Sequence, residues 1–314
     1  MIHFKQVSKH FAGKAVVRDL TLEMAKGEFT VLIGTSGSGK STTLKMINRL
    51  VEHDRGEILF AGEPIEKFRA QDLRRRMGYA IQSIGLFPHW TVEENIATVP
   101  RLLKWPKVKI RDRVTELLKL LNLDPKQFRH RYPHQLSGGQ QQRVGVARAL
   151  ASDPEVLLMD EPFGALDPVT RATLQEEVAR IHKMTHRTIV LVTHDIDEAL
   201  ALADRIVLLN DGQVVQQGTP MELRAGPATP VVRDFCGGSD MGSRLLSLRN
   251  VGTLTRRGEP YSGSGKPLAD TMSLSQALSA FVAQQVQHLP VVNEQGQPLG
   301  VLHFADLTTS GSDT

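Results

Sequence analysis

Apolar residues recur along this chain in two alternating patterns, short strand-sized runs and longer amphipathic stretches. The runs at 28–34, 156–159 and 188–192 predict buried strands. Between them, apolar positions three or four residues apart predict helices with the stripes Leu44, Ile47 and Val51; Ile110, Val114, Leu117, Leu118 and Leu121; and Leu174, Val178 and Ile181. Strands that alternate with helices are typical of an α/β domain with a largely parallel sheet.

The pattern changes after the last of these helices. Two short strands, 206–209 and 213–215, flank Asn-Asp-Gly, which predicts a hairpin. After Phe235, glycines, serines and a basic, poorly periodic stretch predict a linker over 239–267. The first domain is therefore expected to cover residues 1–238.

A second compact pattern begins at residue 268. It predicts a helix with the apolar face Leu274, Leu278, Phe281 and Val282, and two strands at 289–292 and 299–303 joined by a turn at 293–297. We expect a small α+β domain over 268–314.

The composition is that of an ordinary globular protein. Of 314 residues, 40% are hydrophobic and 23% are charged, which excludes a disordered polymer and a membrane-spanning protein. Residues 1–20 show no secretory signal, so we expect the protein to remain in the cytoplasm. The single cysteine, Cys236, excludes an intramolecular disulfide and a metal site built on thiolates. The formal net charge of +4 fits a nucleic acid, an anionic membrane surface or a nucleotide as partner.

A glycine-rich segment between a predicted strand and a predicted helix matches the phosphate-binding pattern G-x-x-x-x-G-K-[ST]. Its glycines let successive backbone N–H groups point at phosphate oxygens, and the helix N-terminus adds partial positive charge. Lys40 is expected to reach the β- and γ-phosphates, and the Ser41 hydroxyl suits Mg²⁺. The residues assigned to this cradle are Gly34, Thr35, Ser36, Gly37, Ser38, Gly39, Lys40, Ser41 and Thr42.

Two adjacent carboxylates follow the buried strand at 156–159. Open α/β sheets place their sites at the carboxyl ends of strands, so this pair is expected to face the phosphates. Asp160 would serve Mg²⁺, and Glu161 would orient or deprotonate the attacking water.

A second glycine-containing helix start lies at Leu136-Ser-Gly-Gly-Gln140. Together with the P-loop and the strand that ends at Asp160, this segment resembles the signature motif of the nucleotide-binding subunit of ATP-binding cassette (ABC) transporters. The resemblance implies a P-loop NTPase fold, with a RecA-like core and a helical subdomain over about 85–150. It also implies a head-to-tail dimer in which Ser137, Gly138, Gly139 and Gln140 of one copy cap ATP on the other.

The same resemblance assigns four further residues. Gln82 matches the Q-loop glutamine that touches Mg²⁺, and Asp167 matches the D-loop at the dimer interface. His194 matches the switch histidine at the γ-phosphate, although a lone histidine after a strand is more often structural. Phe11 matches the aromatic residue that stacks on adenine, with a core strand residue as an equal alternative.

The implied chemistry is ATP hydrolysis with Mg²⁺. Glu161, His194 and Lys40 are the expected catalytic residues, and Ser41, Gln82 and Asp160 the expected metal ligands.

The transported substrate follows from a closer resemblance. Segments 32–57, 73–96 and 131–199 resemble the ATPase subunit of bacterial osmoprotectant importers, which take up glycine betaine, choline and related quaternary amines. The resemblance implies a peripheral subunit on the cytoplasmic face of the inner membrane, with a permease and a periplasmic or tethered solute-binding protein as partners. Residues 84–90 would supply apolar surface to the permease. An importer of an amino acid or polyamine stays open, as does a soluble ABC ATPase acting on nucleic acid, although no nucleic acid is expected.

The C-terminal unit, over 268–307, resembles a single CBS domain. The ribose and phosphate pattern Gly-x-x-Thr/Ser-x-x-Asp appears as Gly300-x-x-His303-x-x-Asp306, with histidine in place of the hydroxyl residue. This departure argues against nucleotide sensing. A sensor of ionic strength and a brace for the dimer both stay open.

Overall fold

The computed structural model of this chain describes residues 1–81, 85–164, 166–225, 229, 232, 249–261, 263, 265–284 and 286–309. The chain divides into two compact units, Met1–Val232 and Arg233–Thr314. The predicted boundary at residue 238 lies outside the described residues. In the described segments, no helix combines the length and the apolar character needed to cross a membrane.

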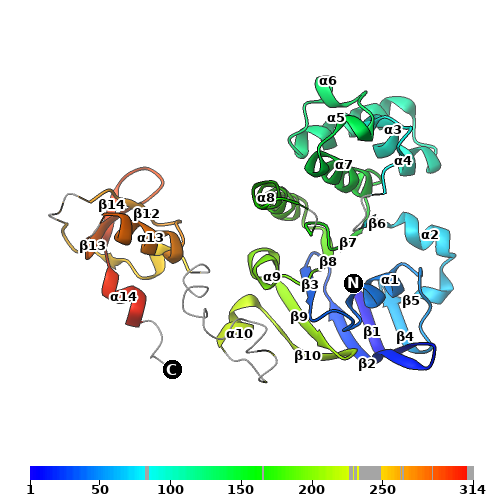
Figure 1. Ribbon diagram of the computed structural model, residues 1–314, viewed down its shortest axis with the longest axis horizontal. Helices are drawn as coiled ribbons and strands as arrows, with labels where there is room; N and C mark the ends of the chain where they lie inside the picture. Colours follow the sequence, from blue (N-terminus) through cyan, green and yellow to red (C-terminus); the bar gives the residue numbers. More distant parts are fainter. Residues whose placement is uncertain are drawn as a thin grey trace. The chain divides into compact units, whose positions relative to one another are not determined.

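The first unit contains a six-stranded sheet with the order β10-β9-β3-β8-β7-β6 (Figure 1). Its strands are β3 (Phe29–Ile33), β6 (Met77–Ala80), β7 (Val156–Asp160), β8 (Thr188–Val192), β9 (Arg205–Asn210) and β10 (Gln213–Gly218). The pairs from β9 to β6 are parallel, and β10 pairs antiparallel with β9 in the predicted hairpin. The predicted α/β architecture with a largely parallel sheet is confirmed.

An antiparallel sheet, which the sequence did not predict, packs against the first. Its order is β2-β1-β4-β5, with β1 (Ile2–Phe11), β2 (Lys14–Met24), β4 (Arg55–Phe60) and β5 (Glu63–Pro64). One hydrophobic core includes Phe4 and Phe60 of this sheet together with Leu32 and Val190 of the parallel sheet. Leu44, on α1 (Lys40–Ile47), belongs to the same core and anchors the helix that follows the P-loop.

A helical region is inserted between β6 and β7, coloured cyan to green in Figure 1. It contains α3 (Val92–Ile96), α4 (Thr98–Leu102), α5 (Lys107–Leu120), α6 (Pro125–Phe128), the 3₁₀ turn η2 (Pro133–Gln135) and α7 (Gly138–Leu150). The predicted apolar stripe of α5 is buried, and the helix is followed by Asn122 at φ 52°. Further helical elements in the described part of the first unit are η1 (Ile65–Lys67), α2 (Ala70–Arg75), α8 (Pro168–Thr185), α9 (Ile196–Leu202) and α10 (Pro220–Ala225).

The helix after the P-loop is shorter than its apolar stripe predicted. It ends at Ile47, so the expectation that Val51 continues the helix is wrong. Arg49 adopts the left-handed conformation, with φ 53°, and the Asn48 side chain accepts a hydrogen bond from the backbone N–H of Leu50 at 3.2 Å. This local hydrogen bond competes with helix continuation.

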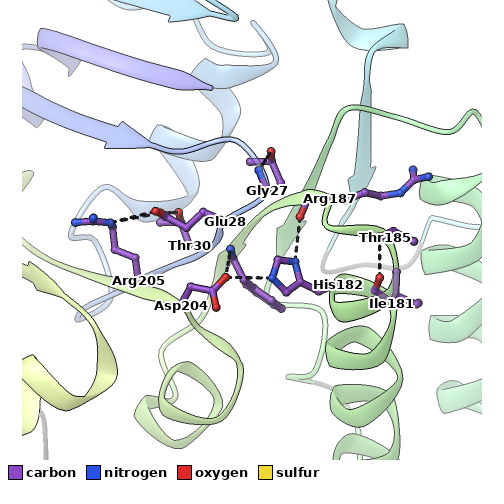
Figure 2. Close-up of polar contacts among 11 residues, drawn as sticks. Gly27, Glu28, Thr30, Ile181, His182, Thr185, Arg187, Asp204 and Arg205 are labelled. Carbon is purple, nitrogen blue, oxygen red and sulfur yellow. Dashed lines mark hydrogen bonds and ion pairs between the residues drawn. The ribbon is translucent and has the colours of Figure 1, made fainter.

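A polar network lies at the start of β3, at the opposite end of this strand from the P-loop. Figure 2 shows its contacts among His182, Arg187 and Asp204. The ring of His182, on α8, lies 3.0 Å from the carbonyl oxygen of Arg187 and 3.1 Å from Oδ2 of Asp204. The same carboxylate oxygen accepts a hydrogen bond from the backbone N–H of Phe29 at 2.8 Å. The network therefore connects α8 to the start of β3, which leads into the P-loop.

The second unit has a four-stranded sheet with the order β11-β14-β13-β12. The elements among its described residues are η3 (Val251–Thr253), β11 (Arg256–Arg257), β12 (Leu268–Ala269), α13 (Leu274–Gln284), β13 (His288–Val292), β14 (Pro298–His303) and α14 (Phe304–Thr309). Val251 and β11, within the predicted linker, belong to this unit: Val251 is buried in its core, and β11 pairs with β14. The α13 face is centred on Leu274, Ala277 and Phe281, whereas Val282, predicted to share it, is 66% exposed.

Candidate functional site

The glycine-rich loop connects β3 to α1 and packs closely against neighbouring backbone. At Gly34, φ is 148° and a Cβ atom would lie 2.0 Å from the carbonyl oxygen of Leu209. At Gly39, φ is 94° and a Cβ atom would lie 2.7 Å from the carbonyl oxygen of Val16. Both positions therefore require glycine, for conformation and for space.

Lys40 is buried within this loop, with 6% of its surface exposed. Its Nζ donates hydrogen bonds to the carbonyl oxygens of Gly34 and Thr35, each at 2.8 Å. Burial lowers the pKa of Lys40, while the charges of Glu161 and Asp160 act in the opposite direction. The ammonium group is thus held over the loop by acceptors that phosphate oxygens would replace.

Ser41 and Asp160 meet at the carboxyl end of β7. The Ser41 hydroxyl donates a hydrogen bond to Oδ1 of Asp160 at 2.8 Å. The Tyr79 hydroxyl, on β6, lies 3.5 Å from the second carboxylate oxygen, and burial raises the pKa of Tyr79 well above its usual value. Tyr79 therefore stays a protonated donor toward Asp160. The sequence pattern gave no signal for Tyr79, because it did not predict β6.

Glu161 and His194 follow two neighbouring strands of the sheet, β7 and β8. Oε1 of Glu161 lies 3.4 Å from Nδ1 of His194. Glu161 adopts the left-handed region, with φ 45°, and its backbone N–H donates to the carbonyl oxygen of Val192 at 2.9 Å. This unusual conformation, held by β8, places the carboxylate beside His194.

The P-loop, Glu161 and His194 surround a cavity of about 380 Å³. Its lining comprises Val16, Ser36, Gly37, Ser38, Gly39, Lys40, Ser41, Thr42, Glu161 and His194. The structure thus brings the P-loop, Glu161 and His194 together, as expected from their places at the carboxyl ends of parallel strands. Val16 carries no chemical signal and reaches the cavity through its packing against Gly39.

The side-chain oxygen atoms of Ser41 and Asp160 are suitable ligands for Mg²⁺. Among the described residues, no group of three or more His, Cys, Asp and Glu side chains forms a metal site by itself. Mg²⁺ is commonly bound through one or two protein oxygens, with water and substrate phosphates completing its shell. The hydroxyl of Ser41 and the carboxylate of Asp160 provide such oxygens beside the phosphate loop. Gln82, the third predicted ligand, lies outside the described residues.

The segment Ser137–Gln140 begins α7 with a reciprocal capping box. The Ser137 hydroxyl accepts from the backbone N–H of Gln140 at 3.3 Å, and Oε1 of Gln140 accepts from the backbone N–H of Ser137 at 3.0 Å. A Cβ atom on Gly138 would meet nothing within 4 Å, whereas one on Gly139 would lie 2.1 Å from Cγ2 of Thr170 on α8. None of the described residues that line the phosphate cavity comes from this segment.

Asp167 and Phe11 are the two remaining predicted site residues that the structure describes. Asp167 is the N-cap of α8 and accepts from the backbone N–H of Thr170 at 3.1 Å, and hydrogen bonds from Thr170 lower the pKa of Asp167. Phe11 ends β1, is 46% exposed and lies 5.3 Å from Nζ of Lys9, measured to the ring centroid. Because Phe11 is exposed, the alternative of a core strand residue is wrong.

Of the predicted permease segment 84–90, residue 84 lies outside the described residues. The loop at 85–91 presents an aromatic pair beside α3. The rings of Phe87 and Trp90 have centroids 4.4 Å apart, and Phe87 is 40% exposed. The fully buried Asn95 accepts from the backbone N–H of Phe87 at 2.8 Å and donates to the carbonyl oxygens of Phe87, Trp90 and Thr91 at 3.0–3.2 Å. This single side chain therefore fixes the loop.

In the second unit, two side chains of the candidate nucleotide-binding pattern, His303 and Asp306, pair with other residues of the same unit. Oδ1 and Oδ2 of Asp306 accept two hydrogen bonds from Arg256, at 2.7 and 3.0 Å, and Nε2 of His303 lies 2.8 Å from Oε1 of Glu259. A Cβ atom on Gly300 would lie 2.1 Å from the carbonyl oxygen of Arg256. The glycine and the aspartate therefore have structural roles in joining β11 to β14 and α14.

Comparisons with known proteins agree with this geometry. A family model described as ABC transporter matches residues 17–164, and a CBS domain model matches residues 267–312. The glycine betaine uptake system ATP-binding protein of Escherichia coli (strain K12) is 64% identical over 307 residues, which cover 98% of this chain and 99% of that protein. The glycine betaine/carnitine/choline transport ATP-binding protein of Bacillus subtilis (strain 168) is 48% identical and covers 94% of this chain and 76% of that protein.

Solved structures of an ABC transporter cassette are also similar to this chain. The dimeric structure of a bacterial ABC transporter cassette matches with a TM-score of 0.64 and 34% identity, over 70% of this chain and 99% of that chain. A post-hydrolysis state of the same cassette, bound to ADP and Pi, matches with a TM-score of 0.63 and 33% identity over the same shares.

Proposed function

Since the chain belongs to the ABC transporter family, we propose that it is the ATP-hydrolysing, energy-coupling subunit of a bacterial importer for glycine betaine, choline or related quaternary amines. The observation that carries this proposal is the similarity to the E. coli glycine betaine uptake protein, which extends over nearly the whole of both chains. Relatives named for sulfate/thiosulfate import match about three quarters of this chain, with 46–47% identity. The similarity to the quaternary-amine relatives therefore extends over a larger share of this chain, 94–98%.

The phosphate loop binds the triphosphate of ATP through its backbone N–H groups and Lys40. Nζ of Lys40 exchanges the carbonyl oxygens of Gly34 and Thr35 for phosphate oxygens. Ser41 and Asp160, with Gln82, would hold Mg²⁺, which neutralises phosphate charge when bound. The exposed ring of Phe11 offers its face to adenine, since the β1–β2 hairpin that carries it also places Val16 in the cavity wall.

Glu161 accepts the proton of the attacking water. Its carboxylate lines the phosphate cavity beside His194, and the two side chains are 3.4 Å apart. His194 orients a γ-phosphate oxygen and keeps Glu161 in place, while Lys40 stabilises the charge that develops on the transferred phosphoryl group.

A second copy of the chain completes the site. Ser137, Gly138, Gly139 and Gln140 do not line the cavity of their own chain, yet they form a helix N-terminus with an open face at Gly138. In a head-to-tail dimer this N-terminus caps ATP on the partner copy, and Asp167 lies at the interface. ATP then holds the dimer together and hydrolysis releases it.

The loop at 85–91 is proposed as the contact with the permease. Its exposed Phe87 and the neighbouring Trp90 form an apolar surface whose backbone is fixed by Asn95. We accordingly propose a peripheral subunit on the cytoplasmic face of the inner membrane, in a complex that includes a solute-binding protein.

The second unit is proposed to act without a nucleotide. The pairing of Asp306 with Arg256 and of His303 with Glu259 leaves the altered motif occupied by its own side chains. Truncation after Gly238 separates the remaining roles. Unchanged salt dependence of transport would exclude a sensor of ionic strength and leave a brace for the dimer.

The proposed function is tested by uptake of radiolabelled glycine betaine and choline into cells that lack their own osmoprotectant importers and produce this chain with its permease and solute-binding protein. Uptake that requires wild-type Lys40 is expected. Equal uptake with the wild-type chain and with Lys40→Ala would refute an energising role. ATP-dependent uptake of an amino acid or polyamine instead of glycine betaine or choline would refute the proposed substrate class.

A further inference from the structure

Arg171 lies on the first turns of α8 and contacts two loops of the proposed site. Its Nη2 donates a hydrogen bond to the carbonyl oxygen of Leu166 at 3.3 Å, just before Asp167. Its Nη1 lies 3.6 Å from Oδ2 of Asp195, the residue after His194. One guanidinium group thus connects the segment expected at the dimer interface with the segment that carries His194.

The His194 segment is held firmly on the side that Arg171 contacts. Oδ1 of Asp195 caps α9 by accepting from the backbone N–H groups of Asp197 and Glu198, at 2.8 and 3.3 Å. The backbone N–H of Asp195 donates to the hydroxyl of Thr193 at 3.0 Å, and that hydroxyl donates to Oε2 of the buried Glu198 at 2.6 Å. A displacement of Asp195 would therefore move the backbone of His194.

The Arg171 side chain is partly shielded from water. It is 33% exposed, and its Nε atom is buried without a hydrogen-bond partner. A charge that is partly removed from water depends more on its few partners than a surface charge does. The planar fork of arginine can also engage two acceptors in fixed relative positions, which lysine cannot.

We propose that Arg171 is a positioning residue that couples the segment at residues 166–167 to His194 through Asp195. When the second copy docks against Asp167, the position of the Leu166 carbonyl oxygen sets the position of the guanidinium group, and the ion pair with Asp195 carries that change to His194. The inference rests on the proposed function, because it assigns the coupling of dimer formation to ATP hydrolysis.

The first test measures ATP hydrolysis by the purified full-length chain over a range of ATP concentrations. Arg171→Ala should lower kcat about tenfold and change KM for ATP less than about twofold, because binding at the P-loop is untouched. Arg171→Lys should recover part of the loss. The matched control is Arg180→Ala, on the same helix, which removes a guanidinium group bound to the carbonyl oxygen of Leu120, away from the site; it should keep wild-type kcat.

A double-mutant cycle distinguishes coupling from a general loss of stability. Asp195→Asn keeps an acceptor for the α9 cap but removes the charge that faces Arg171. If the pair acts as one unit, the double variant should have the kcat of the more impaired single variant. Losses that multiply, a wild-type kcat in Arg171→Ala, or full recovery by Arg171→Lys would each overturn the inference. A wild-type chain without ATP hydrolysis would instead refute the proposed function itself.

Discussion

Asn95 gives the most direct test of how the loop at 85–91 is built. Replacing Asn95 with alanine removes four hydrogen bonds between this buried side chain and the loop. Two of the affected acceptors keep another partner: the carbonyl oxygen of Phe87 accepts from Trp90, and that of Thr91 accepts from the backbone N–H of residue 95. The net loss is therefore concentrated on the backbone N–H of Phe87 and the carbonyl oxygen of Trp90.

The expected cost follows from these two groups. At about 1 to 1.5 kcal/mol for each hydrogen bond lost, the free energy of unfolding of the first unit should fall by about 2 to 3 kcal/mol. For a unit of this size, such a change lowers the melting temperature by about 4 to 12 °C. Because Asn95 does not line the phosphate cavity, basal ATP hydrolysis well below the melting temperature should stay within about twofold of wild type.

Two assays check this reasoning. Thermal unfolding followed by circular dichroism measures the stability, and glycine betaine uptake with the permease measures coupling, which should fall more than basal hydrolysis. The control is Thr98→Val, which removes a hydroxyl bound to the helix carbonyl oxygens of Glu94 and Asn95 and leaves the loop intact. A melting temperature of Asn95→Ala within 1 °C of wild type, or uptake equal to that of Thr98→Val, would refute the structural role assigned to Asn95.

Two further predictions concern a buried cation and an exposed carboxylate. Lys40→Ala should weaken ATP binding about 100-fold or more, because two charge-assisted contacts are lost, whereas Lys45→Ala on the same helix should leave it unchanged; isothermal titration calorimetry decides, and equal affinities would contradict the P-loop assignment. Hydrogen bonds from Lys9 and then from the backbone of His10 lower the pKa of Asp54 to about 2, so its stabilising effect is present above pH 4 and is lost as the pH falls toward 2. The melting temperature of Asp54→Asn should therefore lie below that of wild type at pH 7 and approach it below pH 4, and a difference that grows on acidification would exclude this linkage.

The parts of the site predicted from sequence are those whose chemistry is local. The P-loop needs a strand, glycines, a lysine and a hydroxyl within a short segment, and all of them are adjacent in the chain. Asp160, Glu161 and His194 follow buried strands, so the parallel sheet brings them together once its order is known. Their proximity was therefore predictable without any knowledge of the loops.

Residues that act through packing were not predictable. Val16 lines the cavity because β2 passes over Gly39, and Tyr79 approaches Asp160 because β6 pairs with β7. Arg171 was hidden for the same reason, since its two partners lie on loops from different parts of the chain. These contacts depend on tertiary structure, which apolar periodicity does not encode.

The predicted boundaries of helices and domains were wrong where the apolar pattern along the chain did not determine the local structure. The helix after the P-loop ends before Val51 because Arg49 turns left-handed. In the second unit, Val251 looked like part of a linker because its apolar partners, Leu268 and Phe281, are distant in sequence.

We propose that two copies of this chain hydrolyse ATP at shared sites, with Glu161 as the base. The most direct measurement is size-exclusion chromatography with light scattering of Glu161→Gln, with Mg²⁺ and ATP, together with its rate of phosphate release. We expect a stable ATP-bound dimer and a hydrolysis rate at least about 100-fold below wild type. A variant that hydrolyses ATP at a near wild-type rate, or that stays monomeric with saturating ATP, would contradict it.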